Sequence, residues 1–402
     1  AFFKYTDMGI AVRASAENGE RASLLGIPVK RVSTVVWVLA TVLSAVGVFL
    51  RAPLVGLPLT GFVGPSILLL GLAVAVIARM ESLPTAFFAG MLIGIIDRAA
   101  VFSTRRASLA NAVMLVVILV ALLAQRGKLS RAHDTGASTW RAVKEFKPVP
   151  AELRDVAEVT WARLATAITV GLLVLGVPFI LGDAKTSSAT LVVIYAMVGV
   201  SLVILTGWAG QISLGQFAIA GIGAAVAGGL AANHGMDFFL SLILGGLAGA
   251  LVAVLIGLPA LRIQGLFLAV TTLAFAFTVE SFVLRREWFA WLLPRDLKYV
   301  DRPVLYGRFD TTADSELFGV TIFADTKFYY LCVVFLALAL AVARSIRRTR
   351  SGRLLVGTRE NERMMQSFGV NLARTRLAAF AISGFIAAVA GGLFAYLQGS
   401  VT

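Results

Sequence analysis

Long apolar runs alternate with polar segments along almost the whole chain. Most runs approach 20 residues, the length that an α-helix needs to cross about 30 Å of hydrocarbon. The predicted spans are residues 32–50, 57–77, 83–100, 109–124, 164–181, 189–205, 217–230, 239–256, 266–283, 328–343 and 377–397. Because the runs are continuous rather than alternating, they favour helices over the strands of a β-barrel. The pattern predicts an all-α, polytopic helical bundle in a membrane.

Composition shows what surrounds these runs. Hydrophobic residues make up 58% of the 402 positions and charged residues only 14%, whereas soluble domains carry about a quarter charged residues. So few polar side chains cannot cover a protein of this size in water, and membrane lipid is the expected solvent. A net charge of +14 would suggest nucleic acid in a soluble protein. Here Lys and Arg lie in segments between apolar runs, which indicates membrane topology and no nucleic-acid partner.

Three polar regions divide the chain and predict its orientation. Residues 126–163 and 344–376 carry an excess of basic residues, whereas residues 284–327 balance their bases with Asp and Glu. Because basic loops stay in the cytoplasm, the first two regions are expected inside and the third, the insert, outside. The predicted organisation is a first part at 1–125, a cytoplasmic linker at 126–163 and a second part at 164–402.

The chain also contains an internal repeat. An offset of 343 residues aligns 6–46 with 349–389. The identical pairs are Thr6/Thr349, Gly9/Gly352, Glu17/Glu360, Asn18/Asn361, Gly26/Gly369, Arg31/Arg374, Ala45/Ala388 and Val46/Val389. Chance similarity between two basic loops would produce matches confined to residues such as Ala and Val. The matched Glu-Asn pairs and glycines favour duplication, so we expect two related halves and an interior piece of a longer fused protein.

Each copy holds a short polar stretch that we name a Glu-Asn segment, the first at residues 6–26 and the second at 349–369. Its candidate coupling residues are Arg13, Glu17, Asn18 and Gly26 in the first segment, and Arg359, Glu360, Asn361 and Gly369 in the second. A short amphipathic helix of this kind can dock in a groove of a soluble partner, and the glycine permits a left-handed turn at its end. The alternative is a solvated basic loop that only fixes topology.

A glycine-rich stretch at residues 207–223 carries the candidate pathway residues. They are the glycines Gly207, Gly210 and Gly215 and the uncharged polar residues Gln211, Ser213 and Gln216. Glycine allows a broken or re-entrant backbone, and amide and hydroxyl groups bind a polar solute without burying a charge. The stretch therefore predicts a pathway lining. The alternative is a small-residue interface between packed helices.

Several kinds of chemistry are not expected. The chain has no G-x-x-x-x-G-K-[ST] phosphate loop, so it is not expected to hydrolyse ATP. Its two histidines, His133 and His234, lie in separate polar segments, and Cys332 is the single cysteine. These residues form no metal-binding pattern and no nucleophile–base pair. We therefore expect no catalytic residue, no metal and no cofactor.

Five stretches resemble one family of transport proteins. Residues 207–224 (GWAGQISLGQFAIAGIGA) and 257–274 (GLPALRIQGLFLAVTTLA) resemble glycine-rich segments of branched-chain amino acid ABC permeases. Residues 352–399 are similar to that family's cytoplasmic coupling segment and following helix. The polar stretch before Val32 and residues 82–90 (SLPTAFFAG) resemble its partner subunit, so the chain looks like the later part of one permease subunit fused to the earlier part of the other. The family usually has glycines where residues 79–81 (Arg-Met-Glu) stand, which leaves the solute in doubt rather than the fold.

The resemblance implies a permease of a bacterial ABC importer in the cell (inner) membrane. It implies two cytoplasmic ATP-binding subunits on the Glu-Asn segments and an extracytoplasmic solute-binding protein, for which the insert is either a docking surface or a passive cap. Branched-chain amino acids are the implied solutes, with urea and short amides open. The alternatives are an autonomous secondary transporter or channel, a membrane enzyme and a scaffolding subunit.

Overall fold

A computed structural model shows how these segments fold. It describes residues 5–55, 64–78, 82–104, 107–124, 156–261, 265–285, 293, 300–305, 309–312, 314–317 and 320–400. The chain divides into two compact units, the first containing residues 1–68 and 127–139 and the second containing residues 69–126 and 140–402. We describe each unit by itself.

The elements follow one another in chain order. The helices of the earlier part are α2 (Asp7–Glu17), α3 (Gly19–Leu24), α4 (Val29–Val55), α5 (Gly64–Ile77), α6 (Leu83–Thr104), α7 (Ala107–Ala124) and α8 (Ala157–Leu181). Then come α9 (Asp183–Leu202), the π-helix η3 (Val203–Trp208), α10 (Gln216–His234), α11 (Phe238–Ala260), α12 (Leu266–Thr278) and the π-helix η4 (Val279–Val283). The last elements are strands β1 (Val304–Leu305), β2 (Phe309–Asp310), β3 (Ser315–Leu317) and β4 (Val320–Ile322), then helices α14 (Ala324–Arg348), α15 (Arg350–Glu360), α16 (Glu362–Ser367) and α17 (Leu372–Gln398).

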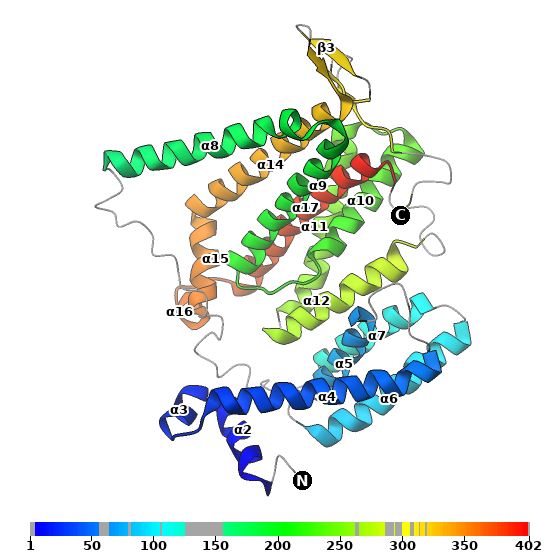
Figure 1. Ribbon diagram of the computed structural model, residues 1–402, viewed down its shortest axis with the longest axis vertical. Coiled ribbons are helices and arrows are strands. Elements are labelled where there is room, and N and C mark those ends of the chain that lie inside the picture. The colour runs from blue at the N-terminus through cyan, green and yellow to red at the C-terminus, as the bar shows by residue number, and fades with distance from the viewer. Residues whose placement is uncertain are drawn as a thin grey trace. The chain divides into compact units, whose positions relative to one another are not determined.

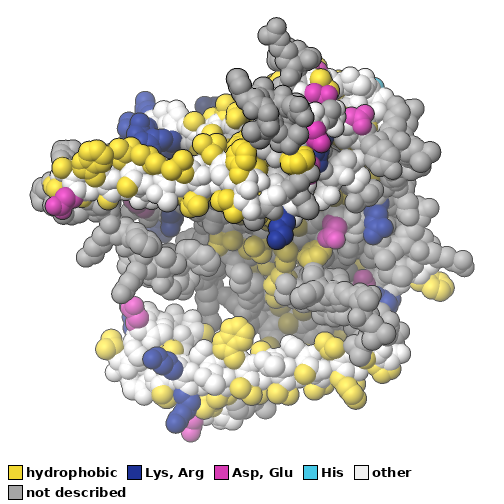
Figure 2. Space-filling view, turned by 45° about the horizontal axis from the view of Figure 1, so that its top comes forward, with side chains coloured by type: hydrophobic (Ala, Val, Ile, Leu, Met, Phe, Trp, Pro, Cys, Tyr) yellow, Lys and Arg dark blue, Asp and Glu magenta, His cyan; other side chains and the backbone are white. Residues whose placement is uncertain are grey.

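Each predicted span overlaps one of these helices, which confirms the all-α, polytopic membrane bundle. Within the described residues, seven helices are long and apolar enough to cross a membrane, namely α4, α8, α9 with η3, α10, α11, α14 and α17. Hydrophobic side chains follow the surfaces of α4 and α8 in Figure 2. The large exposed hydrophobic residues of these two helices include Trp37, Phe49, Leu172 and Phe179. Such faces are stable in lipid rather than in water.

The centre of the second unit is α17, which packs against α9, α10 and α11 (Figure 1). Glycines allow these helices to approach closely. A Cβ atom added to Gly391 would lie 1.8 Å from the carbonyl oxygen of Ala220, and one added to Gly223 would lie 2.2 Å from that of Ala388. The helices α10 and α17 are therefore in backbone contact, as is common where membrane helices associate without a hydrophobic driving force.

Helix α8 contacts α9 and α14 and is attached through backbone groups. Pro178 lies inside α8 and has no N–H, so it cannot donate the usual helical hydrogen bond to the carbonyl of Val174. The hydroxyl of Tyr329 in α14 donates to that carbonyl at 2.8 Å, and Tyr330 donates to the carbonyl of Leu175 at 2.6 Å. The α14 side chain thus satisfies a backbone group that would be costly to leave unpaired in lipid.

Two differences from the predicted boundaries concern the linker and the insert. Helix α8 begins at Ala157, before the predicted span at Leu164, so the end of the predicted linker is helical. In the insert, β1 pairs with β2 and β3 pairs with β4, both antiparallel. These short ribbons are the strands among the described residues, and they lie outside the helical spans. The departure at residues 79–81 falls outside the described residues.

Helix α7 belongs to the predicted first part of the chain (residues 1–125) but lies in the second compact unit. There it packs against α6, and also against α12 and η4 of the predicted second part. Ile118 of α7 is fully buried. In the first unit, α2 and α3 pack against each other and against the start of α4, where Ala22 and Val32 are buried.

Candidate functional site

The predicted pathway segment is a break between two membrane helices. Helix α9 passes into the π-helix η3, and the chain then leaves helical geometry from Ala209 until α10 begins at Gln216. Gly210 lies in the break with a φ of 69°, a left-handed conformation that glycine adopts readily. π-Helices occur frequently at functional sites, and irregular backbone at membrane depth is tolerated where protein or a cavity surrounds it.

Hydrogen bonds fix the path of the break. The amide N–H of Gln211 donates to the carbonyl of Leu205 at 3.1 Å, and the Thr206 hydroxyl donates to the carbonyl of Gln211 at 3.1 Å. From α12, the Thr272 hydroxyl accepts a hydrogen bond from the amide of Leu214 at 2.9 Å. The bonds to η3 and the bond to Thr272 of α12 therefore stabilise this path of the backbone through the break.

The three predicted polar residues are buried in or beside the break. The exposed fractions of Gln211, Ser213 and Gln216 are 5%, 6% and 1%. The amide nitrogen of Gln216 donates to the Ser201 hydroxyl at 3.1 Å, and that of Gln211 donates to the carbonyl of Ala209 at 3.3 Å. The side-chain oxygens of both glutamines are buried without a hydrogen-bond partner. A buried acceptor without a partner costs about 1–3 kcal/mol, so each can accept a donor that enters the site.

The three predicted glycines have different surroundings. A Cβ atom on Gly215 would lie 2.7 Å from the carbonyl oxygen of Thr272, so this position serves close packing with α12. A Cβ atom on Gly210 would lie 2.9 Å from Cγ of Arg359, whereas one on Gly207 would lie 3.6 Å from Cγ1 of Val203 in the same π-helix, an ordinary contact. Packing therefore accounts for Gly215, while Gly207 and Gly210 are associated with Arg359.

A separate cavity lies between α9, α10 and α17. It has a volume of about 180 Å³, and its apolar lining includes Tyr195, Phe217, Leu284 and Phe394. None of the predicted pathway residues lines this cavity, although Phe217 is adjacent in sequence to Gln216. The cavity is therefore distinct from the polar break.

The two Glu-Asn segments have the same local structure. In both, an 11-residue helix (α2 or α15) is followed by a 6-residue helix (α3 or α16) and then by a 27-residue helix (α4 or α17). Asn18 and Asn361 cap the short helices by accepting from the amides of Arg21 and Met364. All helix bounds differ by the predicted offset of 343 residues. The repeat is thus visible in the local structure of both copies.

The predicted left-handed glycines are present in both segments. Gly26 has a φ of 83° and Gly369 a φ of 75°, and both follow the short helix. All eight candidate coupling residues are exposed, namely Arg13, Glu17, Asn18, Gly26, Arg359, Glu360, Asn361 and Gly369. Beside each glycine stands a large exposed hydrophobic side chain, Leu25 at 81% and Phe368 at 69%. Each segment therefore presents an apolar side chain within a polar surface.

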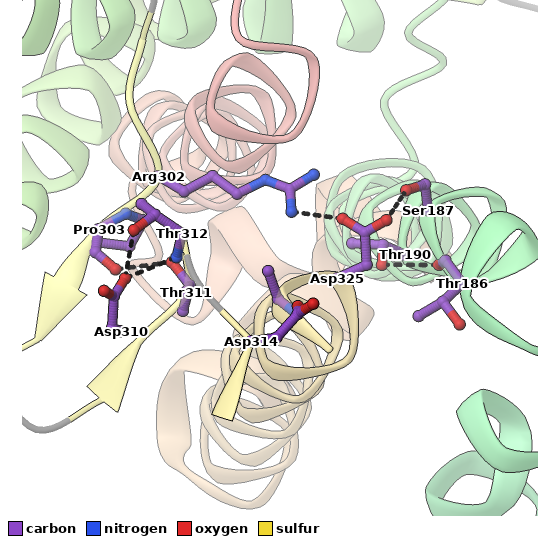
Figure 3. A network of polar contacts seen from close by, with 11 residues as sticks. Thr186, Ser187, Thr190, Arg302, Pro303, Asp310, Thr311, Thr312, Asp314 and Asp325 are labelled. Carbon is purple, nitrogen blue, oxygen red and sulfur yellow. Dashed lines mark hydrogen bonds and ion pairs between the residues drawn. The ribbon is translucent and has the colours of Figure 1, made fainter. Parts of the chain in front are cut away.

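The described part of the insert is tied to three helix ends. Arg302 forms an ion pair with Asp325 in the first turn of α14, and the same carboxylate accepts from the Ser187 hydroxyl of α9 at 2.8 Å (Figure 3). The amide of Val300 donates to the carbonyl of Gly399 beyond α17 at 3.0 Å. The insert precedes α14 and the second Glu-Asn segment follows it, so about 37 Å of helix separates them.

Four residues near the break were not singled out by the sequence reasoning. They are Ser201, Thr206 and Thr272, which hydrogen-bond to it, and Arg347, whose guanidinium carbon lies 5.9 Å from the ring centroid of Trp208. Thr272 belongs to the pair Thr271-Thr272 in residues 257–274, the stretch that resembles the permease family, and this pair is a signal that could have identified it. In the described residues, no group of three or more His, Cys, Asp or Glu side chains could hold a metal ion.

Comparisons with known proteins agree with this arrangement. The family model described as "Branched-chain amino acid transport system / permease component" matches residues 1–122 and 185–402. The high-affinity branched-chain amino acid transport system permease protein LivM of Escherichia coli K12 is 33% identical over 246 residues, which cover 58% of this chain and 58% of that protein. Its Salmonella typhimurium counterpart is 32% identical over 248 residues, with 58% of each chain covered.

A further relative matches a shorter part of the chain. The permease protein LivH of E. coli K12 is 30% identical over 125 residues, which cover 30% of this chain and 40% of that protein. No solved structure matches the chain. The chain spans 58% of the length of the LivM proteins that it matches. Because the family model matches more than half of the chain, this multi-pass membrane protein belongs to the permease component family of branched-chain amino acid transport systems.

Proposed function

We propose that this chain forms part of the translocation pathway of an ATP-driven importer in a bacterial cell membrane. The solute is a branched-chain amino acid or a related small polar molecule, which an extracytoplasmic binding protein delivers. ATP hydrolysis takes place on two separate cytoplasmic subunits, so the chain itself is not an enzyme. The proposal includes the division into the later part of a first permease half at 1–125, a cytoplasmic linker at 126–163 and the earlier part of a second half at 164–402.

The observation that carries the proposal is the pair of Glu-Asn segments with matching local structure. A two-fold pair of ATPase subunits needs two equivalent docking elements. Leu25 and Phe368 stand at equivalent positions and expose most of their side chains. Burying such a side chain in a partner contributes about 1.5–3 kcal/mol. We infer that each segment docks in a groove of one ATPase subunit through this residue.

Copurification tests the docking directly. The full-length parent protein is solubilised from its native membrane in mild detergent, and its stoichiometric partners are identified by mass spectrometry. We expect phosphate-loop ATPase subunits. Phe368→Asp and Leu25→Asp should each weaken their retention about tenfold or more, since a charge replaces a buried apolar contact. Ser345→Asp, which adds the same charge to an exposed position at the end of α14, is the matched control.

The opposite result has a clear meaning. A folded permease that is reproducibly isolated without an ATPase would overturn the proposal and favour an autonomous transporter or channel. If both aspartate variants retain the ATPase, only the assignment of Leu25 and Phe368 as docking residues is wrong.

For the pathway, we propose that Gln211, Ser213 and Gln216 contact the solute and that Gly207, Gly210 and Gly215 shape the break. The support is the burial of the polar side chains and the unpaired oxygens of both glutamines. Gln216→Met removes this oxygen and also the bond to Ser201, whereas Ser201→Ala keeps the oxygen and removes that bond together with the Ser201 bond to the carbonyl of Val198. We expect leucine uptake to fall in Gln216→Met and to persist in Ser201→Ala. Equal losses in both would show that Gln216 has a structural role.

Solute choice is tested by competition. Uptake of labelled leucine is measured in cells that contain the full-length protein, with excess isoleucine, valine or urea added. Competition by isoleucine and valine alone supports branched-chain amino acids. Competition by urea assigns the alternative solute class.

The insert is proposed as the docking surface for the binding protein, with a passive cap as the alternative. Its described residues are anchored to α9, α14 and α17, which gives a partner a stiff support. Asp301 and Asp314 are exposed on it. Charge reversal at both positions should weaken binding-protein association without affecting ATPase retention, and unchanged association would favour the cap.

A further inference from the structure

Two arginines contact the end of η3, where the membrane helix stops. The guanidinium of Arg359 donates to the carbonyl of Gly207, and the guanidinium of Arg347 lies over the ring of Trp208. The carbonyls at a helix end lack helical donors and carry partial negative charge. A positively charged donor at this end is therefore favourable; Arg359 of α15 supplies it, while Arg347 of α14 adds a positive charge beside the ring of Trp208.

The same Arg359 side chain contacts the other side of the break. Its Cγ lies where a Cβ atom of Gly210 would be only 2.9 Å away, so the aliphatic part of the side chain rests on the glycine. Gly210 has a φ of 69° in this position. One side chain thus spans the last turn of η3 and the start of the non-helical segment.

Arg359 lies in the last turn of α15, two residues before the asparagine that caps α16. The two helices are packed closely, because a Cβ atom on Gly357 would lie 2.8 Å from Sδ of Met365. An ion pair between Glu362 and the buried Arg376 also joins α16 to the first turns of α17. A displacement of α16 therefore reaches α15, and with it the Arg359 side chain.

We propose that Arg359 is a positioning residue that transmits movement of the second Glu-Asn segment to the break at residues 209–215. The proposal rests on the proposed function, in which α16 docks on an ATPase subunit. Movement of Arg359 displaces the carbonyl of Gly207 and the backbone at Gly210. Gln211 follows, because its N–H and carbonyl are both bonded to η3.

The test uses the full-length parent in complex with its ATPase subunits, so it needs no identified solute. Hydrogen–deuterium exchange is measured for peptides that cover residues 203–216, with and without a non-hydrolysable ATP analogue. In the wild type, we expect the analogue to change exchange in this segment. In Arg359→Ala, the complex should still assemble, but the change at 203–216 should be lost.

Two further variants separate positioning from folding. Arg359→Lys keeps a cationic donor on an aliphatic stem, so it should preserve most of the nucleotide-dependent change. Arg353→Ala removes another exposed arginine of α15 for which the structure gives no comparable contact with the break, and should behave as the wild type. ATP-driven leucine uptake should fall about tenfold in Arg359→Ala, the effect of losing one charge-assisted hydrogen bond.

Each other outcome overturns the proposal in a distinguishable way. A wild-type exchange change that persists in Arg359→Ala shows that movement reaches the break by another route. Loss of the ATPase subunits from Arg359→Ala assigns the residue to the docking surface instead. A wild-type protein without ATPase subunits overturns the proposed function itself, and this is seen before any variant is compared.

Discussion

The two Glu-Asn segments share their backbone and differ in their attachments. Capping asparagines, helix lengths and left-handed glycines match in both. Among the positions that differ, three carry contacts of the second copy: Ala16 stands where the second segment has Arg359, Gly19 where it has Glu362, and, just after the segments, Ser33 where the second copy has Arg376. The methyl group of Ala16 cannot donate a hydrogen bond, so the first segment lacks the means for an equivalent of the Arg359 contact.

This difference shows what each part of the repeat determines. Caps and glycines act within a few residues, so their retention is enough to keep the fold of the segment. Charged side chains attach that fold to a particular neighbour. Among the described residues, the two segments therefore share their caps and turns, while the second is also linked by an arginine to a broken helix. Exchanging residues between equivalent positions tests this separation.

The largest effect is expected for Gly391→Val, which places the residue of the first copy, Val48, into α17. A Cβ atom there would lie 1.8 Å from the carbonyl oxygen of Ala220, so α10 and α17 must separate. We expect a loss of about 3 kcal/mol or more, the upper range for overpacking. The buried Cys332 is the single cysteine, so its thiol labelling on heating measures the loss. The reverse change, Val48→Gly, should cost only about 0.5 kcal/mol or less, the difference in helix propensity between Val and Gly.

A smaller effect is expected for Arg376→Ser, which introduces the residue of the first copy at the ion pair. Arg376 is buried and Glu362 is partly exposed, so the loss should be about 1–2 kcal/mol. Amide exchange across residues 362–367 should increase. Adding Glu362→Ala should recover part of the loss, because no carboxylate then remains without its arginine. If the stability losses of the two single variants simply add in the double variant, the ion pair between Arg376 and Glu362 does not contribute to stability.

Replacing the left-handed glycines should have equal effects in the two copies. For both Gly26 and Gly369, a Cβ atom would meet nothing within 4 Å, so backbone strain is the only cost. Gly26→Ala and Gly369→Ala should each destabilise the segment by about 1 kcal/mol. Thermal unfolding followed by circular dichroism measures both. A difference of more than about 1 kcal/mol between them would mean that the surroundings, rather than the turn, set the cost.

The smallest effect is expected at the first residue of each segment. The Thr6 hydroxyl accepts from the amide of Gly9 at 3.1 Å and caps α2, whereas the Thr349 hydroxyl donates to the carbonyl of Ile346 at 2.7 Å. Thr6→Ala should cost about 1 kcal/mol, the value of a helix cap, and Thr349→Ala a few tenths. Amide exchange at the first turns of α2 and α15 compares the two. A larger loss at Thr349 would reverse this expectation.

The fold was predictable from the sequence where short-range patterns determine it. Apolar run length identified the helices, the repeat offset aligned the two segments, and Gly26 and Gly369 marked the turns. The break lies within the glycine-rich stretch, and Gln211, Ser213 and Gln216 lie in or beside it. The functional assignment of these residues remains a prediction.

What escaped prediction depends on long-range contacts. Arg359 and Gly207 are 152 residues apart, and no local pattern relates them. Ser201 and Thr272 look like ordinary polar residues in apolar helices until their partners from other segments are known. The π-helix η3 was also unforeseen, because its composition does not differ from that of the α-helix before it. In the insert, pairs of two or three residues were too short to read as strands.

The proline in α8 has a consequence for how the protein is made. The carbonyl of Val174 receives its hydrogen bond from Tyr329, which is 155 residues later in the chain. At a synthesis rate of about 5–20 residues per second, α8 waits on the order of 10–30 s before its donor exists. During this interval, the carbonyl must be satisfied by water or by the insertion machinery. Helix α8 can therefore settle into the bilayer in its final form only after α14 has been translated.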